Sequence, residues 1–331
     1  MKDVLNDLIS HKTLSQQAAH DILIELAQGK HNTSLVSAFM TVYMVRNITI
    51  DELAGFRDAM LDLCVSIKFD QPVMDLCGTG GDGKNTYNIS TLASFIVAAA
   101  GQAVAKHGNY GVSSACGSSN LLQYFGYEFT NEKDKLFKSM EQCNIAFLHA
   151  PLFHPAMKHV APIRKELGVK TFFNMLGPMV NPAAPDIQLV GVFNLELARQ
   201  YAYLYQEGSK QFVIVHALDG YDEISLTGDF KIFSNQGEQL ISPVQLGLAQ
   251  VDADALHGGD TVEAAADIFL EVIQGRGSEA QRAAAIANAG MALFCANQQL
   301  SLTDAVQKAA EALDSGAAYQ TFKRLMELNK K

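Results

Sequence analysis

The chain has 331 residues, 48% of them hydrophobic and 18% charged, which is typical of a globular protein with a large core. Its formal net charge of −10 argues against a general nucleic-acid-binding surface, because such surfaces are normally basic. The five cysteines are scattered and form no C-x-x-C pair, so we predict neither a disulfide framework nor a zinc site. We expect a cytoplasmic protein, since we find no signal-peptide pattern and no apolar run long enough to span a bilayer.

The first 66 residues have a helical pattern and no convincing strand. A short helix is expected within residues 1–10, and a second begins at Ser15 or Gln16 and ends at Gly29. Ser34 is the predicted cap of the third helix, and Thr49 with Glu52 has the capping-box form that starts the fourth. We therefore predict an N-terminal helical domain over residues 1–68, and we expect helices from within residues 150–180 to join it.

After the boundary at residues 68–72 the pattern changes to alternating strands and helices. Apolar strands separated by amphipathic helices are typical of a mostly parallel sheet with helices on both faces, so we predict an α/β domain over residues 72–331. A hairpin and further helices complete the chain. The expected strands are 73–77, 103–106, 145–149, 187–193 and 212–216, with a hairpin of 230–233 and 239–242. The expected helices are 90–100, 119–125, 131–142, 154–167, 195–205 and a helical C-terminal region with starts near Thr261 and Ser278.

A glycine-rich loop separates the first of these strands from the helix that follows it. Residues 75–91 read DLCGTGGDGKNTYNIST. Such a loop at a helix N-terminus points several backbone N–H groups at one place and favours anions, so we predict a phosphate or pyrophosphate cradle; a glycine turn that binds nothing is the alternative. The spacing fits neither the G-x-G-x-x-G fingerprint nor the P-loop. Asn88 and Ser90 either cap the helix or contact a ligand.

Polar residues follow other predicted strands of the sheet. Lys106 ends an apolar strand and must reach solvent or an anion, because a buried unpaired ammonium is costly. The adjacent Asp222 and Glu223 are either solvated charges or magnesium ligands. Arg164 either lies along the surface or binds a carboxylate with both nitrogens. Ligands of doubly wound proteins gather at the carboxyl ends of the strands, where these loops are expected.

Eight segments, in order, resemble the anthranilate phosphoribosyltransferases. The resemblance implies transfer of a 5-phosphoribosyl group from phosphoribosyl pyrophosphate (PRPP) to the amine of anthranilate, a pentosyltransferase reaction of tryptophan biosynthesis that releases pyrophosphate. It also implies Mg²⁺ as cofactor and a homodimer formed through the N-terminal helical domain. The matching segments are 78–82, 88–91, 106–109, 113–118, 154–158, 164–171, 173–178 and 222–225.

The resemblance also implies roles for individual residues. Ser90, Asp222 and Glu223 are expected to hold the metal, and Gly78, Asn109, His154 and Arg164 to bind anthranilate. No general acid or base is assigned, because an aromatic amine is already nucleophilic and catalysis can rest on the metal and on positioning. The residues expected to bind PRPP are Gly78, Thr79, Gly80, Gly81, Asp82, Thr86, Asn88, Ile89, Ser90, Thr91, Lys106, His107, Gly108, Asn109, Ser114, Gly117 and Ser118.

The chain departs from the common family pattern at Tyr110, where many members have arginine, and at Asn120 and Gln123, where acids are frequent. Two other functions are considered. A pyrimidine nucleoside phosphorylase of similar architecture would carry an Arg-Gly-Leu-Gly-His-Thr-Gly-Gly-like run, which is absent here. A non-catalytic relative that binds nucleotides or nucleic acid is disfavoured by the net negative charge and by the Asp222-Glu223 pair.

Overall fold

The computed structural model describes residues 1–111 and 115–330, and the chain folds into two compact units. Unit 1 consists of Met1–Ile67 and Ala150–Pro182, and unit 2 consists of Lys68–His149 and Ala183–Lys331. Unit 1 is helical in its described part, whereas unit 2 contains a sheet with helices packed on it.

The first segment of unit 1 forms the four predicted helices, which are α1 (Lys2–Ile9), α2 (Gln16–Ala27), α3 (Thr33–Val45) and α4 (Ile50–Asp62). Ser15 caps α2, and Thr49 and Glu52 form the predicted capping box of α4. The predicted cap of α3 is wrong. Asn32 caps this helix instead of Ser34, because its side chain accepts a hydrogen bond from Leu35 N.

The second segment of unit 1 consists of short helical pieces, which are α8 (Ala150–Phe153), η1 (Pro155–His159), α9 (Ala161–Leu167), α10 (Phe173–Leu176) and η2 (Gly177–Val180). Pro162 lies in the first turn of α9, where a missing N–H costs nothing. Phe172 joins this segment to the four helices by stacking on Phe56 of α4 with ring centroids 4.5 Å apart. Phe39 and Tyr43 of α3 meet Phe172 edge-on, so one aromatic cluster forms the core of this unit.

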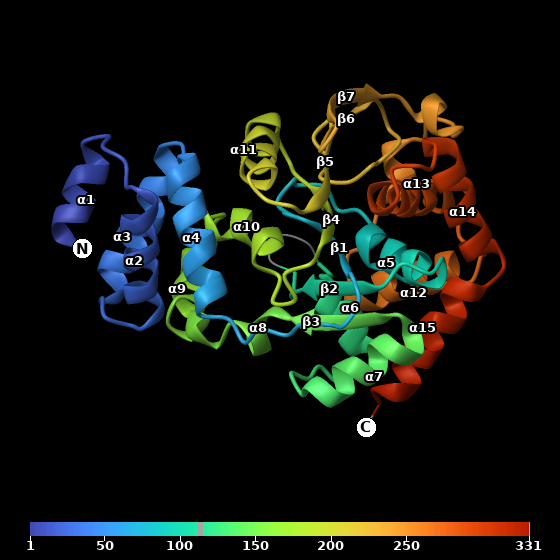
Figure 1. Cartoon of the computed structure of the whole chain (residues 1–331), viewed down its shortest axis with the longest axis horizontal. Coiled ribbons are helices and arrows are strands. Elements are labelled where there is room, and N and C mark those ends of the chain that lie inside the picture. Colours follow the sequence, from blue (N-terminus) through green and yellow to red (C-terminus); the bar gives the residue numbers. More distant parts are fainter. Residues whose placement is uncertain (112–114, 331) are drawn as a thin grey trace. The chain divides into compact units, whose positions relative to one another are not determined.

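Unit 2 contains a seven-stranded sheet in the order β3-β2-β1-β4-β5-β6-β7 (Figure 1). The first five strands are parallel and the last two antiparallel, which confirms the mostly parallel sheet and the hairpin. The hairpin turn is shorter than expected because Ser234 pairs with Gly237. The strands are β1 (Met74–Gly78), β2 (Val104–Gly108), β3 (Ile145–His149), β4 (Ile187–Gly191), β5 (Gln211–Ala217), β6 (Phe230–Ser234) and β7 (Gly237–Ile241).

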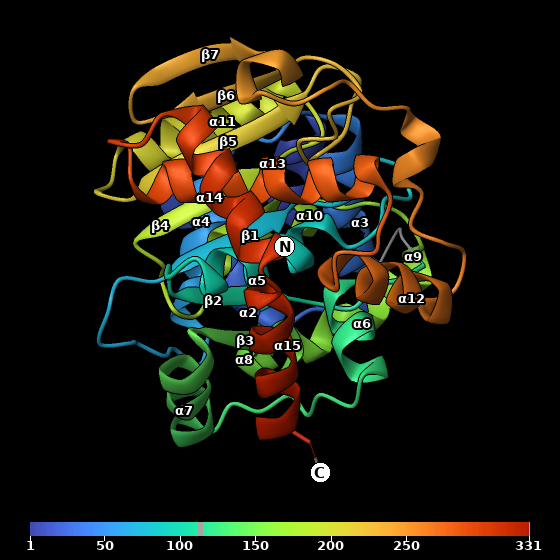
Figure 2. The same ribbon diagram turned by 90° about the vertical axis from the view of Figure 1, so that its right-hand side faces the viewer.

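Helices cover both faces of this sheet, as predicted. In Figure 1, α11 (Leu195–Gln206) lies on one face, and α5 (Ile89–Ala99) and α13 (Glu279–Ala296) lie on the other. Figure 2 views the α13 side from outside. The remaining helices of this unit are α6 (Ser118–Tyr124), α7 (Lys133–Cys143), η3 (Pro243–Leu246), η4 (Ala253–Leu256), α12 (Val262–Ile273), α14 (Leu302–Asp314) and α15 (Ala317–Leu328).

Helix α5 is the central helix of the unit 2 core. Its residues from Thr91 to Ala98 are buried, and it packs against β1, α13 and α15. Because both faces of α5 are covered, its N-terminus is fixed at the carboxyl edge of the sheet, next to the glycine-rich loop. None of the helices within the described residues has the length and apolarity needed to cross a membrane.

Candidate active site

The glycine-rich loop begins where β1 ends, and its glycines allow either a positive φ or a close approach of another segment. Gly80 and Gly81 have positive φ values of 66° and 79°. Gly78 is required by close approach, since a Cβ there would lie 2.3 Å from Asp222 Oδ2. Gly191, at the end of the neighbouring β4, is tighter still, because its Cβ would lie 1.4 Å from the carbonyl oxygen of Asp222. The Asp222 segment therefore packs directly on the ends of two strands.

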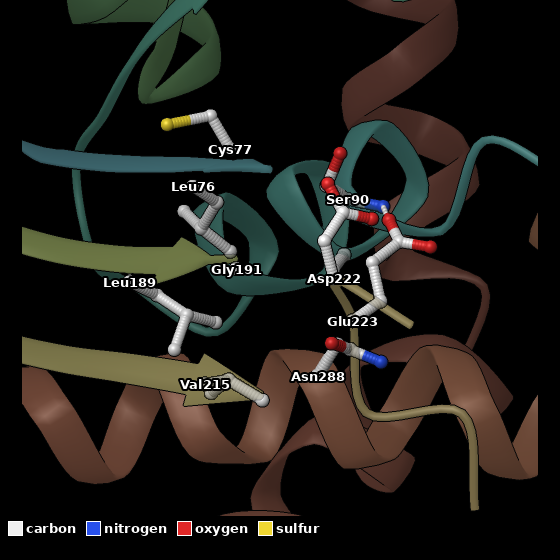
Figure 3. Close-up of a pocket in the computed structure, with 10 residues that line it drawn as sticks. Leu76, Cys77, Ser90, Leu189, Gly191, Val215, Asp222, Glu223 and Asn288 are labelled. Atoms are coloured by element: carbon white, nitrogen blue, oxygen red, sulfur yellow. Dashed lines mark hydrogen bonds between the residues drawn. The ribbon is translucent and has the colours of Figure 1, made fainter. Parts of the chain in front are cut away.

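The two predicted metal-binding carboxylates hydrogen-bond to the glycine-rich loop and to the start of α5. Asp222 Oδ2 accepts a hydrogen bond from Gly80 N at 2.7 Å, and Glu223 Oε1 accepts one from Ser90 N at 3.0 Å. Glu223 Oε2 also accepts from the hydroxyl of Thr86 at 3.3 Å. Figure 3 shows the side chains of Asp222 and Glu223 next to Ser90. Residues more than 130 positions apart in the chain thus meet at one site.

The carboxylates of Asp222 and Glu223 are buried close together, so their negative charges repel each other. Burial raises the pKa of Asp222 well above its ordinary value, and the charges of Glu223 and Asp82 raise it further. Burial together with Asp82 raises the pKa of Glu223 to about 7. A divalent cation would relieve this repulsion, and the donors are the hard oxygens that Mg²⁺ prefers. Within the described residues, no three His, Cys, Asp or Glu side chains have the arrangement of a complete metal site, so oxygens of a substrate or of water would have to complete the coordination.

Lys106 lies in β2 and is only 2% exposed. Its Nζ donates a hydrogen bond to the carbonyl of Leu76 and lies 3.5 Å from Ser90 Oγ. Burial lowers the pKa of Lys106, and the carboxylate of Asp75 opposes this effect. The carboxylate of Asp75 therefore favours the charged form of Lys106, and it also accepts a hydrogen bond from His107 N at 3.2 Å. The lysine remains directly beside Ser90.

The loop after β2 folds against the start of α6. The carbonyl of Asn109 accepts hydrogen bonds from Ser119 N at 3.1 Å and from the hydroxyl of Ser118 at 3.4 Å. A Cβ on Gly108 would lie 2.5 Å from Ser118 Oγ, so these two predicted PRPP-binding residues are in contact. A Cβ on Gly117 would lie 2.2 Å from Gly111 N, so Gly117 also packs closely against the backbone of residues 109–111. Ser114, another predicted PRPP-binding residue, lies outside the described residues.

The interpretation of Asn88 or Ser90 as a side-chain helix cap is wrong. Asn88 occupies the N-cap position of α5, but its side chain donates to the carbonyl of Cys116 at 2.9 Å and does not cap the helix. The N–H of Ser90 is instead satisfied by Glu223 from a distant part of the chain. Asn88 therefore joins the glycine-rich loop to the loop after β2, and the hydroxyl of Ser90 faces Lys106.

Other predicted PRPP-binding residues occupy the same region with different exposure. Thr79 is buried, and its hydroxyl has no hydrogen-bond partner in the described part of the chain, which is the state expected of a group that bonds to a ligand. Ile89 and Thr91 are buried in α5, and the N–H of Ile89 donates to Tyr87 O, so neither is freely accessible. The carboxylate of Asp82 accepts from Lys84 N at 3.0 Å.

Two residues at the site were not singled out from the sequence. Asn288 of α13 holds the segment after Glu223 in place, because its side chain accepts from Ile224 N at 3.0 Å and donates to Ile224 O at 2.9 Å. Asp75 was noted only as part of the loop, without its role beside Lys106. The sequence signal that could have identified Asn288 was an asparagine within an alanine-rich helix.

A small pocket at this site is lined by Leu76, Cys77, Ser90, Ala93, Leu189, Gly191, Val215, Asp222, Glu223 and Asn288.

Two of the departures from the common family pattern, Asn120 and Tyr110, make local contacts. The side-chain oxygen of Asn120 accepts hydrogen bonds from Gly111 N at 2.8 Å and Gly117 N at 3.1 Å, which an acid at this position would also accept. The ring of Tyr110 meets His149 edge-on at 4.9 Å. Burial lowers the pKa of His149 to about 4, so this ring is neutral at pH 7.

The remaining predicted anthranilate-binding residues, His154 and Arg164, belong to unit 1, whereas Gly78 and Asn109 belong to unit 2. His154 is buried, and its Nε2 lies 3.0 Å from Val180 O. Arg164 lies in α9, and its guanidinium lies over the ring of Phe173 at 5.0 Å. A shared anthranilate site for these four residues stays a prediction.

The chain matches two domain families. The glycosyl transferase family a/b domain matches residues 70–319, and the glycosyl transferase family helical bundle domain matches residues 2–64.

Proteins of known function resemble the chain over its whole length. The anthranilate phosphoribosyltransferase of Cytophaga hutchinsonii is 52% identical over 328 residues, which cover 99% of this chain and 100% of that protein. That of Flavobacterium psychrophilum is 54% identical over 330 residues, with the same coverage.

Solved structures agree with these sequence relationships. The anthranilate phosphoribosyltransferase of Thermus thermophilus superimposes with a TM-score of 0.91 at 33% identity and covers 98% of this chain and 99% of its own. The Saccharomyces cerevisiae enzyme in complex with PRPP and Mg has a TM-score of 0.88 at 26% identity and covers 98% and 96% of the two chains. The chain described here belongs to the anthranilate phosphoribosyltransferase family.

Proposed function

We propose that the residues gathered at the carboxyl edge of the unit 2 sheet, together with Arg164 and His154 of unit 1, carry out the family reaction in this chain. That reaction is the activity of the chain: it transfers the 5-phosphoribosyl group of PRPP to the amine of anthranilate, gives N-(5-phosphoribosyl)anthranilate and pyrophosphate, and is a step of tryptophan biosynthesis. One observation supports the residue assignment most strongly: Asp222 and Glu223 bond to the N–H groups of Gly80 and Ser90, so carboxylates and cradle form one site.

The donor site is formed by the glycine-rich loop, the start of α5, Lys106 and the loop after β2. Backbone N–H groups at a helix N-terminus and a lysine are suited to phosphate oxygens. The unpartnered hydroxyl of Thr79 and the hydroxyls of Ser90 and Ser118 add further donors. Phosphate bound there would also offset the charge of Lys106, which burial disfavours.

Ser90, Asp222 and Glu223 hold Mg²⁺ in this proposal, and the Saccharomyces cerevisiae relative was solved with PRPP and Mg. Bound there, Mg²⁺ supplies positive charge for the departing pyrophosphate. The residues of the chain hold PRPP in place. The glycine-rich loop binds its phosphates, and Lys106 lies next to the hydroxyl of Ser90. As the bond to pyrophosphate breaks, the leaving group takes the bonding electron pair and the ribose becomes oxocarbenium-like. The lone pair of the aromatic amine then forms the new bond to carbon, and the nitrogen releases its extra proton to water without a protein base.

Anthranilate is bound by Gly78, Asn109, His154 and Arg164 in this proposal. The guanidinium of Arg164 matches a carboxylate in shape and charge, and no ion pair with an acidic side chain occupies it in the described residues. Because these residues come from both units, the two units act as two domains, a helical domain of residues 1–68 with helices from 150–180 and a catalytic domain of residues 72–331. The contacts of the chain cluster in a similar division, which supports this proposal.

The chain works in the cytoplasm as a homodimer that assembles through its helical unit. What supports the dimer is a set of exposed apolar side chains on α1 and α3, where Ile9 is 65% and Val45 is 80% exposed. Helices α1 and α3 pack on each other. A second copy of the chain would cover these side chains.

The metal assignment is tested with the double variant Asp222→Asn, Glu223→Gln. It keeps the shape of both side chains but removes their charges, so we expect kcat/KM to fall at least about a hundredfold at low Mg²⁺. Steady-state assays at varied Mg²⁺ concentrations measure this. The matched control is Asp229→Asn, an exposed carboxylate in the same segment, which should leave kcat/KM unchanged. A double variant with wild-type kcat/KM at low Mg²⁺ would contradict the assignment.

A further inference from the structure

Arg164 of unit 1 is surrounded by side chains that fix it and leave its charge unmatched. Its Nη2 lies 3.4 Å from the side-chain oxygen of Asn174, a neutral acceptor, and its guanidinium lies over Phe173. Burial lowers its pKa, and no acidic side chain forms an ion pair with it within residues 1–111 and 115–330. A partly buried cation held by neutral groups is arranged to receive an anion from outside the protein.

Asn174 also holds Thr171. Its side-chain oxygen accepts a hydrogen bond from Thr171 N at 3.1 Å, so Arg164 and Thr171 converge on one atom and lie next to each other. In return, Asn174 N donates to Thr171 O at 3.0 Å. Asn174 therefore fixes the loop between α9 and α10 and the direction of the guanidinium at the same time.

The hydroxyl of Thr171 is buried without a hydrogen-bond partner among the described residues. Thr171 is 5% exposed, and its Oγ1 makes no hydrogen bond to any described residue. Leaving a buried hydroxyl without a partner costs about 1–3 kcal/mol, so folding alone would favour valine at this position. A ligand that reaches Arg164 would give this hydroxyl an acceptor.

The support of Arg164 extends into the aromatic core of unit 1. Phe173 stacks on Phe172 with centroids 4.4 Å apart, and Phe172 stacks on Phe56 of α4. The guanidinium of Arg164 therefore packs on a stack of aromatic rings that extends from Phe173 to Phe56 in the helical bundle. This arrangement gives the bundle a part in substrate binding, because it fixes the face on which Arg164 rests.

We propose that Thr171 and Asn174 complete the carboxylate site of Arg164: Asn174 is a positioning residue that aims the guanidinium, and the hydroxyl of Thr171 donates a hydrogen bond to the anthranilate carboxylate. This inference rests on the proposed function for its ligand. A carboxylate is preferred to a donor phosphate because the planar guanidinium pairs with it through two parallel bonds, and Thr171 adds a single neutral donor beside them.

Two variants test the inference. Thr171→Val keeps the shape and removes the hydroxyl, so we expect the KM and the equilibrium Kd for anthranilate to rise roughly tenfold, with an unchanged KM for PRPP and an unchanged or higher Tm. Asn174→Asp keeps the acceptor for Thr171 N but pairs its charge with Arg164, so it should weaken anthranilate binding by at least about tenfold. A role that is structural alone would leave both constants for anthranilate unchanged.

The matched control is Asn235→Asp. Asn235 also accepts a backbone N–H through its side-chain oxygen, from Phe212 at 2.9 Å, but it lies in the hairpin turn of unit 2, so its variant should bind anthranilate like the wild type. Binding is followed by the fluorescence of anthranilate itself, which requires no turnover. If the wild type binds and the two variants bind equally well, the inference is overturned, whether or not turnover occurs. If the wild type binds anthranilate and both variants bind it about tenfold more weakly, but the wild type forms no product, the inference stands and the proposed function fails. A wild type that does not bind anthranilate overturns the inference.

Discussion

At the scale of single residues, close approach of the backbone decides what the site can tolerate. Gly191 does not need glycine for its own conformation, since its φ is not positive. It needs glycine because the carbonyl of Asp222 occupies the space of a side chain. The position of the carboxylate pair is therefore set by the ends of β1 and β4 as well as by its own loop.

Gly191→Ala is expected to displace Asp222 and to lower kcat/KM at least about tenfold, because a Cβ 1.4 Å from a backbone oxygen forces the Asp222 segment to move. Steady-state kinetics measure the change. Gly208→Ala is the control: its Cβ would meet no atom closer than 3.8 Å, and it should retain wild-type kinetics. Equal activity of the two variants would show that the site does not depend on this approach.

Residues that carry local signals could be predicted from the sequence, and residues that act only through distant contacts could not. The glycine-rich loop was singled out because its composition is unusual over a few positions, whereas the sequence pattern left the Asp222-Glu223 pair open and only the family resemblance implied a metal role for it. Asn288 was not singled out, because its bonds to Ile224 span 64 positions. The helix-cap interpretation of Ser90 failed for the same reason, since the group that satisfies its N–H is 133 positions away.

At the scale of elements, helix α4 shows how a local signal can also support tertiary structure. Glu52 belongs to the predicted capping box with Thr49, and it is fully buried. Its carboxylate also forms an ion pair with Arg46 and accepts hydrogen bonds from Leu14 N and the hydroxyl of Tyr43. The sequence predicted the box, but the buried network depends on how α3 and α4 pack.

Glu52→Ala should destabilise the protein by about 3–5 kcal/mol, because it leaves the buried Arg46 charge unmatched and several N–H groups unbonded. Thermal unfolding measures the loss. Asp51→Ala removes an exposed acid from the same first turn and should cost less than about 1 kcal/mol. Equal unfolding temperatures of the two variants would contradict this account of the network.

The same network predicts a dependence of stability on pH. Burial acts to raise the pKa of Glu52, but the bonds from Arg46, Thr49 and Leu14 outweigh it, so the pKa is lowered from its ordinary value of 4.5. The contribution of this group is fully present above pH 4.5 and is lost as the pH falls through the lowered value.

At the scale of the whole molecule, the pattern of strands and helices predicted the architecture of unit 2, which is a mostly parallel sheet with a hairpin. Alternation identifies elements, but it does not give the spatial order of the strands, which depends on long-range packing. Helices from within residues 150–180 were expected to join the N-terminal helical domain, and residues 150–182 cluster with residues 1–67 in unit 1.

Val45→Asp is expected to convert the proposed dimer into a monomer, because it places a charge on an apolar side chain that a second copy would bury. Light scattering after size-exclusion chromatography measures the mass. The control is Val244→Asp, a valine of similar exposure, 77% against 80%, in unit 2, which should leave the mass unchanged. A wild-type protein that is monomeric at micromolar concentration would contradict the proposal directly.

The assignment of the reaction is tested most directly by mixing the purified protein with anthranilate, PRPP and Mg²⁺ and following the fluorescence of anthranilate. Transfer of the phosphoribosyl group to the amine consumes anthranilate, so the account predicts a loss of its fluorescence that requires all three components and is matched by release of one pyrophosphate per anthranilate. Unchanged fluorescence, together with phosphorolysis of uridine or thymidine by the same preparation, would contradict it.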